Sequence, residues 1–248
     1  MSGRADGREG LFIVFEGVEG AGKSTQLIAV ADRLRRAGVD HLVVREPGGT
    51  PVGEQARALV LSPDLEMCAE SELFLYLTSR AEFVRRLVIP ALDAGRLVLA
   101  DRYELSTLAY QGAARGLDLD RVRDANRLAT GGLVPDLTVL LRIAPERGRG
   151  RQSGQADRLE SERAEFHESV AAAYDRMAAS DPAIVTVAAD GEPAGVHDQI
   201  WRELSRRWPD RFPPARAETG NIWSANEFQE KSSSASGETT EATGQEVE

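Results

Sequence analysis

Short apolar runs recur along most of the chain and alternate with longer segments of helical spacing. Leu11–Glu16 (LFIVFE) is the clearest run, because it is apolar almost throughout and is followed at once by glycine-rich sequence. A continuous apolar run of this length is typical of a buried strand in a parallel sheet. The same pattern predicts further strands at His41–Arg45, Arg96–Asp101, Leu137–Ile143 and Ala183–Ala188.

Between the runs, apolar residues return every three or four positions, which predicts helices with one buried face. From Lys23 to Ala37 these positions share a face, and Gly38 is a residue type that commonly ends a helix. Pro90 is expected to bend or interrupt the longest segment. The other predicted helices are Glu54–Leu61, Ala69 to about Ala94, Arg158–Ala179 and Gly195–Trp208.

Strands that alternate with helices predict right-handed βαβ crossovers and an α/β fold. We expect a central, mostly parallel sheet of about five strands, flanked by helices on both faces. No internal repeat is visible, and 248 residues suit one sizeable domain of this kind better than two.

The two ends differ in composition from the rest. Residues 1–10 are polar and are expected to be disordered, and they lack the apolar core of a signal peptide. Residues 213–248 are rich in Ser, Thr, Gly and Glu, and we expect a disordered acidic tail because few apolar residues anchor it. Trp223 and Phe228 are exceptions that either dock or remain unanchored. The domain itself is therefore predicted to span residues 11–212.

Charge and cysteine content narrow the function further. The net charge is −10, and residues 216–248, with seven acids and two bases, carry −5 of it. The remainder is only mildly acidic, which gives no indication of a nucleic-acid-binding surface. No apolar run approaches the roughly 18 residues of a membrane helix. Cys68 is the only cysteine, which excludes an internal disulfide, and a cytoplasmic location is expected.

The strongest motif follows the first predicted strand. Gly17–Ser24 (GVEGAGKS) fits the phosphate-binding loop pattern G-x-x-x-x-G-K-[ST] at every required position. Glycines let such a loop curl so that its backbone N–H groups converge on phosphates, and the next helix presents its N-terminus to the same anion. Lys23 is expected to reach the β- and γ-phosphates, and the Ser24 hydroxyl to bind Mg²⁺. The alternative is a glycine-rich turn that matches by chance.

This loop does not identify the acceptor, because GTPases, ATPases, kinases and helicases share it. Asp101 ends another predicted strand, at the edge of the sheet where α/β proteins bind ligands. It is a candidate Mg²⁺ ligand or, alternatively, a helix cap. Tyr76 and Arg80 lie four residues apart on a predicted helix and so share a face. They can stack on a base and hydrogen-bond its carbonyl edge, or be a core tyrosine and a solvated arginine.

Five stretches of the chain, taken together, resemble the successive motifs of bacterial thymidylate kinases. They occur in the order and at the spacing of that family, from about Phe12 to the last predicted helix near Trp208. The stretches are EGVEGAGKST, REPGGTPVGE, DRYELSTLAYQGAARGLD, PDLTVLL and DRLESERAEFHE. The resemblance implies a P-loop nucleoside monophosphate kinase-like fold. It also implies transfer of the γ-phosphoryl group of ATP to dTMP with Mg²⁺, in a homodimer.

The resemblance also implies roles for matching residues. Lys23, Arg102, Arg151 and Glu19 correspond to catalytic positions, Glu19 being near the dTMP sugar and magnesium. Tyr76 falls where the family commonly stacks a phenylalanine on thymine, and Arg80 where it reads the thymine carbonyl. The implied dTMP-binding residues are Glu19, Glu46, Arg57, Tyr76, Arg80, Arg102, Ser106, Thr107, Tyr110 and Gln111. The implied ATP-binding residues are Gly17, Val18, Glu19, Gly20, Ala21, Gly22, Lys23, Ser24, Thr25 and Arg158.

The stretch Ala144–Arg158 is polar and carries several arginines, which suits a lid that brings positive charge to a transferred phosphoryl group. Arg151 aligns best with the lid arginine of the family, and Arg158 is second. Ser153, Gly154 and Gln155 depart from the family, in which many members carry further arginines there. The alternative for the stretch is a solvated basic loop.

Two other functions remain open on the sequence. Another nucleoside monophosphate or deoxynucleoside kinase would share the fold and the P-loop. A nucleotide-binding protein without catalytic activity would agree with the acidic tail and with a lid that carries fewer arginines than in many family members. Lys23, Arg102 and Arg151 favour an active enzyme, because these positions supply positive charge to phosphates.

Overall fold

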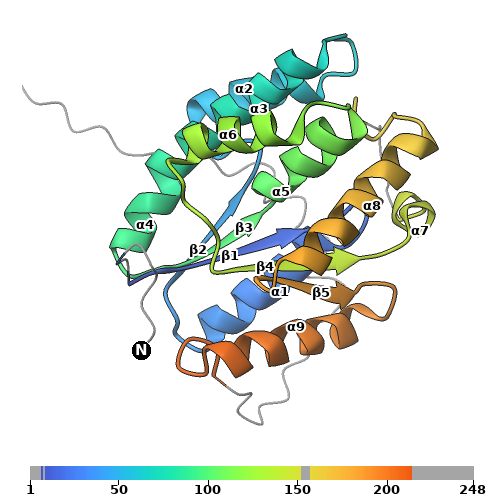
Figure 1. Ribbon diagram of the computed structural model, residues 1–248. Helices are drawn as coiled ribbons and strands as arrows, with labels where there is room; N and C mark the ends of the chain where they lie inside the picture. Colours follow the sequence, from blue (N-terminus) through green and yellow to red (C-terminus); the bar gives the residue numbers. More distant parts are fainter. Residues whose placement is uncertain (1–6, 8, 152–156, 214–248) are drawn as a thin grey trace, which may run out of the picture. The chain divides into compact units, whose positions relative to one another are not determined.

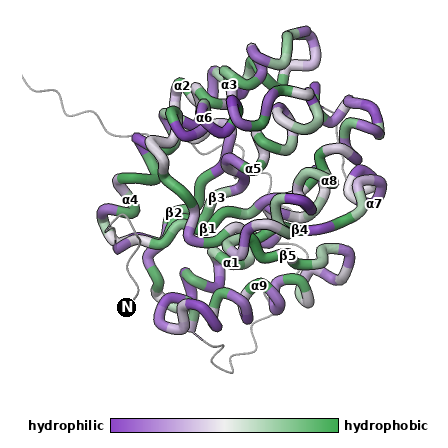
Figure 2. The backbone as a smooth tube through the Cα atoms, in the orientation of Figure 1, coloured by the Kyte–Doolittle hydropathy of each residue, from purple (hydrophilic) through white to green (hydrophobic). Residues whose placement is uncertain are grey.

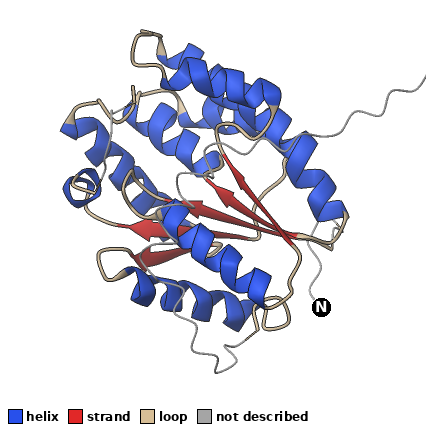
Figure 3. Ribbon diagram, turned by 180° about the vertical axis from the view of Figure 1, so that it is seen from behind, coloured by secondary structure: helices blue, strands red, loops and turns tan. Residues whose placement is uncertain are grey.

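The structure, a computed structural model, describes residues 7, 9–151 and 157–213. In this part of the chain five parallel strands form one sheet in the order β2-β3-β1-β4-β5, with helices on both faces (Figure 1, Figure 3). This confirms the predicted α/β fold with a parallel central sheet. The strands are β1 (Leu11–Glu16), β2 (His41–Arg45), β3 (Leu97–Asp101), β4 (Leu137–Arg142) and β5 (Ile184–Ala188).

Strand β1 lies in the middle of the sheet, between β3 and β4, and both of its faces are covered by apolar side chains. Ile13 and Phe15 belong to the same core cluster as Val30 of the first helix. Phe12 and Val14 point the other way and pack in a second cluster with Phe83. Figure 2 shows this strand and its neighbours as largely hydrophobic segments at the centre of the sheet. A strand that alternates between two cores reads as a continuous apolar run, which is why the sequence predicted it.

The helices divide between the two faces of the sheet. On one face, α1 packs against α9 and the strands. On the other face α3 packs on α2 and α6, and α8 packs on the π-helix η2. The helices are α1 (Lys23–Arg36), α2 (Pro51–Leu61), α3 (Ala69–Phe83), η1 (Val84–Val88), α4 (Ile89–Asp93), α5 (Glu104–Thr107), η2 (Leu108–Ala114), α6 (Leu119–Thr130), α7 (Pro145–Arg149), α8 (Ala164–Ser180) and α9 (Pro193–Arg207).

Several helix boundaries differ from the prediction for local reasons. Helix α2 begins at Pro51 rather than Glu54, because the Thr50 side chain caps Gly53 N and proline favours the first helical turn. Helix α8 begins at Ala164 rather than Arg158, because Asp157 accepts from Leu159 N and Glu160 N and holds a turn there. The predicted long helix changes to π geometry before it reaches Pro90.

Other segments were not predicted as helices at all. Helices α5, η2 and α6 occupy most of the chain between β3 and β4, and α7 lies inside the predicted lid. Within the described ranges no helix is long and apolar enough to cross a membrane. The expectations for residues 1–6, 8 and 214–248, Trp223 and Phe228 included, lie outside the described residues, whereas Gly10 is ordered by its bond to Leu92 O.

Both ends of the described domain meet at the amino edge of the sheet. The Arg211 guanidinium donates to the carbonyl oxygens of Glu9 and Gly95, each at 3.2 Å. Gly10 N also donates to Leu92 O, just before the chain enters β1. The opposite, carboxyl edge is where β1 runs into the P-loop. There the strands are in register, with Asp101 level with Phe15 on one side and Arg45 on the other.

Candidate active site

The P-loop connects β1 to α1 at the carboxyl edge of the sheet. Gly20 and Gly22 have φ angles of 70° and 88°, a left-handed backbone that glycine adopts readily. The Lys23 ammonium folds back over the loop and donates to Gly17 O at 3.1 Å and Val18 O at 2.9 Å. Burial, with the neighbouring Arg102 guanidinium, lowers the pKa of Lys23 to about 8. The P-loop therefore holds the ammonium group of Lys23, shielded from water, against the carbonyl oxygens of the loop itself.

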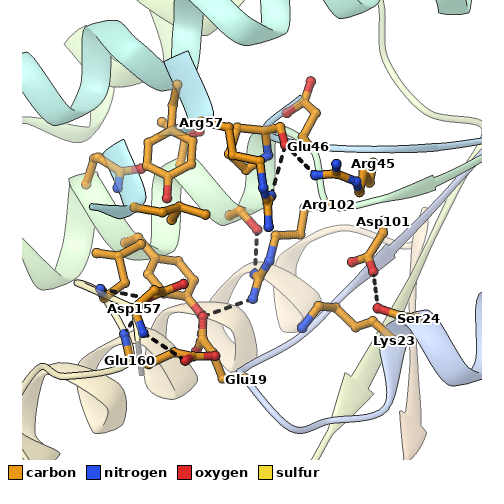
Figure 4. A pocket seen from close by; sticks show the side chains of 18 of the residues that line it. Glu19, Lys23, Ser24, Arg45, Glu46, Arg57, Asp101, Arg102, Asp157 and Glu160 are labelled. Atoms are coloured by element: carbon orange, nitrogen blue, oxygen red, sulfur yellow. Dashed lines mark hydrogen bonds and ion pairs between the residues drawn. The ribbon is translucent and has the colours of Figure 1, made fainter. Parts of the chain in front are cut away.

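A hydroxyl and a carboxylate meet beside this lysine. Ser24 Oγ donates to Asp101 Oδ2 at 2.6 Å, which joins the start of α1 to the end of β3 (Figure 4). Oxygen donors of this kind suit Mg²⁺, which takes one or two protein ligands and completes its shell with water and substrate phosphate. The two residues fit a magnesium site, and the described part of the chain holds no group of three or more His, Cys, Asp and Glu as a competing metal site.

Arg102 is aimed at the P-loop by an unusual backbone. Among the described residues, Arg102 is the one residue other than glycine that has a positive φ angle (74°). Its guanidinium lies 3.0 Å from Glu19 Oε1 and donates to Ser106 Oγ at 3.0 Å. Burial opposes its charge, but Tyr110 and Glu19 hold the pKa of Arg102 well above its ordinary value. A left-handed arginine is strained, and strain of this kind is concentrated at functional sites.

Glu19 and Tyr110 lie next to Arg102 and contact each other. The Tyr110 hydroxyl lies 2.6 Å from both carboxylate oxygens of Glu19. Burial raises the pKa of Glu19, but Arg102 and Lys23 outweigh it, so the pKa stays below its usual value. Glu19 is therefore a carboxylate between two cations.

A second carboxylate, Glu16, lies in the protein interior near Arg102 and Ser106. It was not singled out from the sequence. It is fully buried and accepts hydrogen bonds from Tyr103 N at 2.8 Å, Ser106 Oγ at 2.7 Å and the Tyr174 hydroxyl at 2.8 Å. Glu16 thereby fixes Ser106, which in turn contacts Arg102. The signal in the sequence was an acidic residue at the end of an otherwise apolar run.

These side chains border a cavity of about 320 Å³ between the P-loop, α2, α3 and η2 (Figure 4). Most residues expected to bind dTMP line it. They are Glu19, Glu46, Arg57, Tyr76, Arg102, Ser106, Thr107, Tyr110 and Gln111. The cavity also contains Lys23, Ser24 and Asp101, so the expected donor and acceptor residues share one space.

Arg80 is the exception, because it lies beneath the cavity wall and is only 1% exposed. Its Nε and one terminal nitrogen contact Glu46 Oε2 at 2.7 and 2.6 Å. The remaining N–H groups bond to Tyr103 O, Thr107 Oγ1 and Asn126 Oδ1. All five donors of the guanidinium are thus engaged within the protein. In this structure the Arg80 guanidinium is held in a buried network beneath the cavity wall.

Glu46 shares that network and faces the cavity. Burial raises the pKa of Glu46 to about 7, against the lowering effect of Arg80. Next to it, Arg57 donates to Pro47 O at 3.0 Å, and Arg45 pairs with Glu54 at 3.1 Å. Arginines therefore gather at the end of the cavity where the chain leaves β2.

The lid arginines do not line the cavity in this structure. Arg151 donates to Ala189 O at 2.9 Å, beyond the end of β5. Arg158 donates to Val60 O at 3.0 Å and pairs with Glu72 at 2.6 Å, on the acceptor side and away from the P-loop. In this structure α2 and α3 therefore hold the Arg158 side chain. Ser153, Gly154 and Gln155 fall outside the described residues.

The segment after the lid supplies lining residues that sequence reasoning missed. Asp157, Leu159 and Glu160 border the cavity, and Figure 4 shows Asp157 and Glu160 on the same side of the view as Glu19. Glu72, buried in α3, holds this region together by accepting from Gln111 Nε2 at 2.7 Å and from Arg115 at 3.0 Å. Hydrogen bonds from Arg115, Gln111 and Arg158 keep the pKa of Glu72 below its usual value although burial raises it.

Comparison with known proteins gives a consistent result. A family model described as "Thymidylate kinase" matches residues 15–200. A thymidylate kinase of a Synechococcus strain is 46% identical over 200 residues, which cover 80% of this chain and 96% of that protein. One from Deinococcus radiodurans is 46% identical over 202 residues, covering 80% and 98%. A crystal structure of thymidylate kinase from Ehrlichia chaffeensis matches with a TM-score of 0.65 and 27% identity, covering 79% of this chain and 98% of that one.

Proposed function

The chain belongs to the thymidylate kinase family, and from this premise we propose how its residues transfer the γ-phosphoryl group of ATP to dTMP. The enzyme is a nucleotide-binding phosphotransferase of dTDP synthesis. The observation that carries the residue assignment is the shared cavity, in which P-loop residues and the residues matched to dTMP border one space.

Acceptor binding is assigned to the side of the cavity away from the P-loop. Tyr76 offers a ring for stacking on the base, at 1–3 kcal/mol for a typical aromatic–base contact. Arg57 and Arg102 neutralise the phosphate of dTMP. Tyr110, fixed on Glu19, borders the sugar. Because Arg80 has no donor left over, its role is to fix Thr107 and Glu46 in the wall rather than to reach the base.

The transfer is a direct in-line displacement. A phosphate oxygen of dTMP forms a bond to the γ-phosphorus, while the bond from that phosphorus to the β,γ-bridging oxygen breaks and leaves ADP. Lys23 exchanges its carbonyl partners for the β- and γ-phosphates, and Arg102 neutralises charge on the acceptor phosphate. Arg151 is the arginine proposed to reach the transferred group from the lid.

Mg²⁺ is the proposed cofactor. When bound, it neutralises charge on the β- and γ-phosphates. Ser24 Oγ and the Asp101 carboxylate would hold it, because they are neighbouring oxygen donors at the foot of the P-loop.

Substrate choice is the direct test. Steady-state ADP release is measured with dTMP, dUMP, dCMP, AMP and thymidine as acceptors. The proposal expects kcat/KM to be highest for dTMP, and a Lys23→Ala variant to lose turnover. Preference for thymidine over dTMP would contradict the proposal, because the cavity would then receive a nucleoside without a phosphate.

A homodimer is proposed on the outer surface of α3 and α6. Phe74 is 61% exposed and Leu128 is 82% exposed, on two helices that pack side by side. Exposed large apolar side chains on neighbouring helices favour contact with another protein surface. Sedimentation equilibrium is expected to give twice the chain mass, and the Phe74→Asp, Leu128→Asp variant the chain mass. A monomeric wild-type protein would refute the assignment.

A further inference from the structure

Two glycines meet where α7 passes over the P-loop. A β-carbon added at Gly148 would lie 2.3 Å from the carbonyl oxygen of Glu19, and one added at Gly20 would lie 2.0 Å from Gly148 O. Both distances are far below van der Waals contact, and in each case the obstacle is backbone, which cannot rotate aside as a flexible side chain can. The lid helix therefore rests on the P-loop with no side chain between them.

Gly148 requires glycine for space and not for its own backbone conformation. It lies within α7 and is buried, and its φ is not in the left-handed region. At such a helical position alanine is ordinarily better than glycine by about 0.5–1 kcal/mol. Gly20 differs, because its φ of 70° favours glycine by itself. Gly148 is thus the residue at which the close approach can be tested alone.

The contact lies next to the lid arginines. Arg151 N donates to Gly148 O at 3.0 Å, and the Arg151 guanidinium bonds to Ala189 O. Arg147 pairs with Asp190 at 3.4 Å. Arg147 lies on α7 next to Gly148, and Arg151 follows just after the end of the helix and bonds to Gly148 O, so any rise of α7 above the P-loop shifts both arginines with it.

A collision at Gly148 is expected to move α7 rather than the P-loop. The P-loop side of the contact is Glu19, whose carboxylate is held by Arg102 at 3.0 Å and by Tyr110 at 2.6 Å. Helix α7 has five residues, and Arg147, its partner Asp190 and Arg151 are exposed. The more weakly held element gives way, and the acceptor side of the cavity keeps its form.

We propose that Gly148 is a positioning residue, whose missing side chain lets α7 seat directly on the backbone of Glu19 and Gly20 and so sets the reach of the lid arginine toward the phosphates. This inference rests on the proposed function of the P-loop and of Arg151. A misplacement of about 1 Å in such an arrangement can cost a factor on the order of 100 in rate.

The experiment compares Gly148→Ala with Gly150→Ala in the full-length protein. An added β-carbon at Gly150 would lie 3.6 Å from its nearest atoms, which is ordinary contact, so this variant controls for a stiffer lid. We expect kcat for dTMP phosphorylation to fall 10- to 100-fold in Gly148→Ala and to stay within twofold in Gly150→Ala. The Kd of dTMP, measured by calorimetry without ATP, is expected to change less than twofold in both.

Hydrogen exchange provides a readout that does not depend on turnover. The amides of Gly148 and Arg151, which bond within α7 and to its end, are expected to exchange faster in Gly148→Ala only. Wild-type kcat in Gly148→Ala overturns the inference. So does an equal loss in both variants, a parallel loss of dTMP binding, or the loss of a cooperative unfolding transition in Gly148→Ala. A wild-type protein without dTMP kinase turnover would instead contradict the proposed function.

Discussion

Arg80 and Glu46 form an ion pair from which water is excluded, and this has a consequence for stability. Both side chains are almost completely buried, and the arginine is the main group that opposes the raised pKa of Glu46. Removing one partner of a buried pair leaves an uncompensated charge, which typically costs 3–5 kcal/mol.

Arg80→Met is therefore expected to lower the free energy of unfolding at pH 8 by about 3–5 kcal/mol, as measured by urea denaturation. The loss should be smaller at pH 6, because Glu46 is then protonated and no charge is left unpaired. Adding Glu46→Gln to Arg80→Met should recover part of the loss at pH 8. Equal losses in the single and double variants would show that the charge of Glu46 is not the cause.

Arg151 and Arg147 offer a comparison between two lid arginines. Arg151 bonds to a backbone carbonyl at the end of β5, whereas Arg147 pairs with an exposed aspartate. Arg151→Ala is expected to lower kcat on the order of 100-fold or more with little change in the KM of dTMP, as for arginines that stabilise a transferred phosphoryl group. Arg147→Ala is expected to change kcat less than threefold. A reversed order in steady-state assays would assign the role to Arg147.

At the residue scale, sequence motifs identified most lining positions but not which way their side chains face. Tyr76 and Arg80 were expected to face the ligand together because they lie four residues apart on a helix. The structure keeps Tyr76 at the cavity and buries Arg80, because Glu46 and Asn126, 34 and 46 residues away in sequence, take its donors. Pairings over such separations leave no periodic signal in a single sequence.

At the scale of elements, α9 carries a histidine whose protonation opposes folding. His197 is buried against Trp201, near Arg33 of α1 and Asp198. Burial, and secondarily Arg33, lower its pKa from 6.5 to about 4, while Asp198 acts in the opposite direction. The unfolded chain then binds a proton more readily than the folded one, so stability falls as pH drops from about 6.5 toward 4.

The difference between a pKa of 6.5 and one of about 4 corresponds to roughly 3 kcal/mol. Urea denaturation between pH 7 and pH 4.5 is expected to show a steeper loss of stability in the wild type than in His197→Phe. An NMR titration of the His197 ring should give a midpoint near 4. A midpoint near 6.5 would mean that the folded protein accepts the charge without cost.

Elements with a single clear period were predicted well, and those without one were not. All five strands match the prediction to within one residue at either end, because each is a short run buried in the sheet. The region of α5 and η2 has its polar residues turned inward toward Glu16, Glu72 and Arg80, so its apolar spacing is irregular. The helical pattern is therefore not visible in the segment that lines the cavity, because polar side chains occupy positions that are apolar in other helices.

At the scale of the whole molecule, the part of the chain that matches known relatives is shorter than the chain. The family model ends at residue 200, and relatives that are covered over 96–98% of their own length match only 80% of this chain. Trp201 Nε1 donates to Pro213 O, which marks the last described contact of the domain. About a fifth of the chain therefore lies outside the length matched by these relatives.

A protein truncated after Pro213 is expected to keep kcat and the KM values of both substrates within twofold of the full chain. Its melting temperature should change by no more than a few degrees. Truncation before Trp201 is the contrasting variant, since Trp201 is buried in the main core and its loss should prevent folding. A loss of turnover in the first truncation would give the tail a part in catalysis.

The bond network around Arg211 joins the first and last described segments at the amino edge of the sheet, whereas the cavity opens at the carboxyl edge. For protein engineering, this means that both ends of the described domain lie on the same side and away from substrate entry. An affinity handle or a tether to a solid support attached next to Glu9 or Pro213 would start at the edge of the sheet opposite the cavity. Linking the two ends and opening a new break at an exposed loop is correspondingly a practical route to a circular permutant.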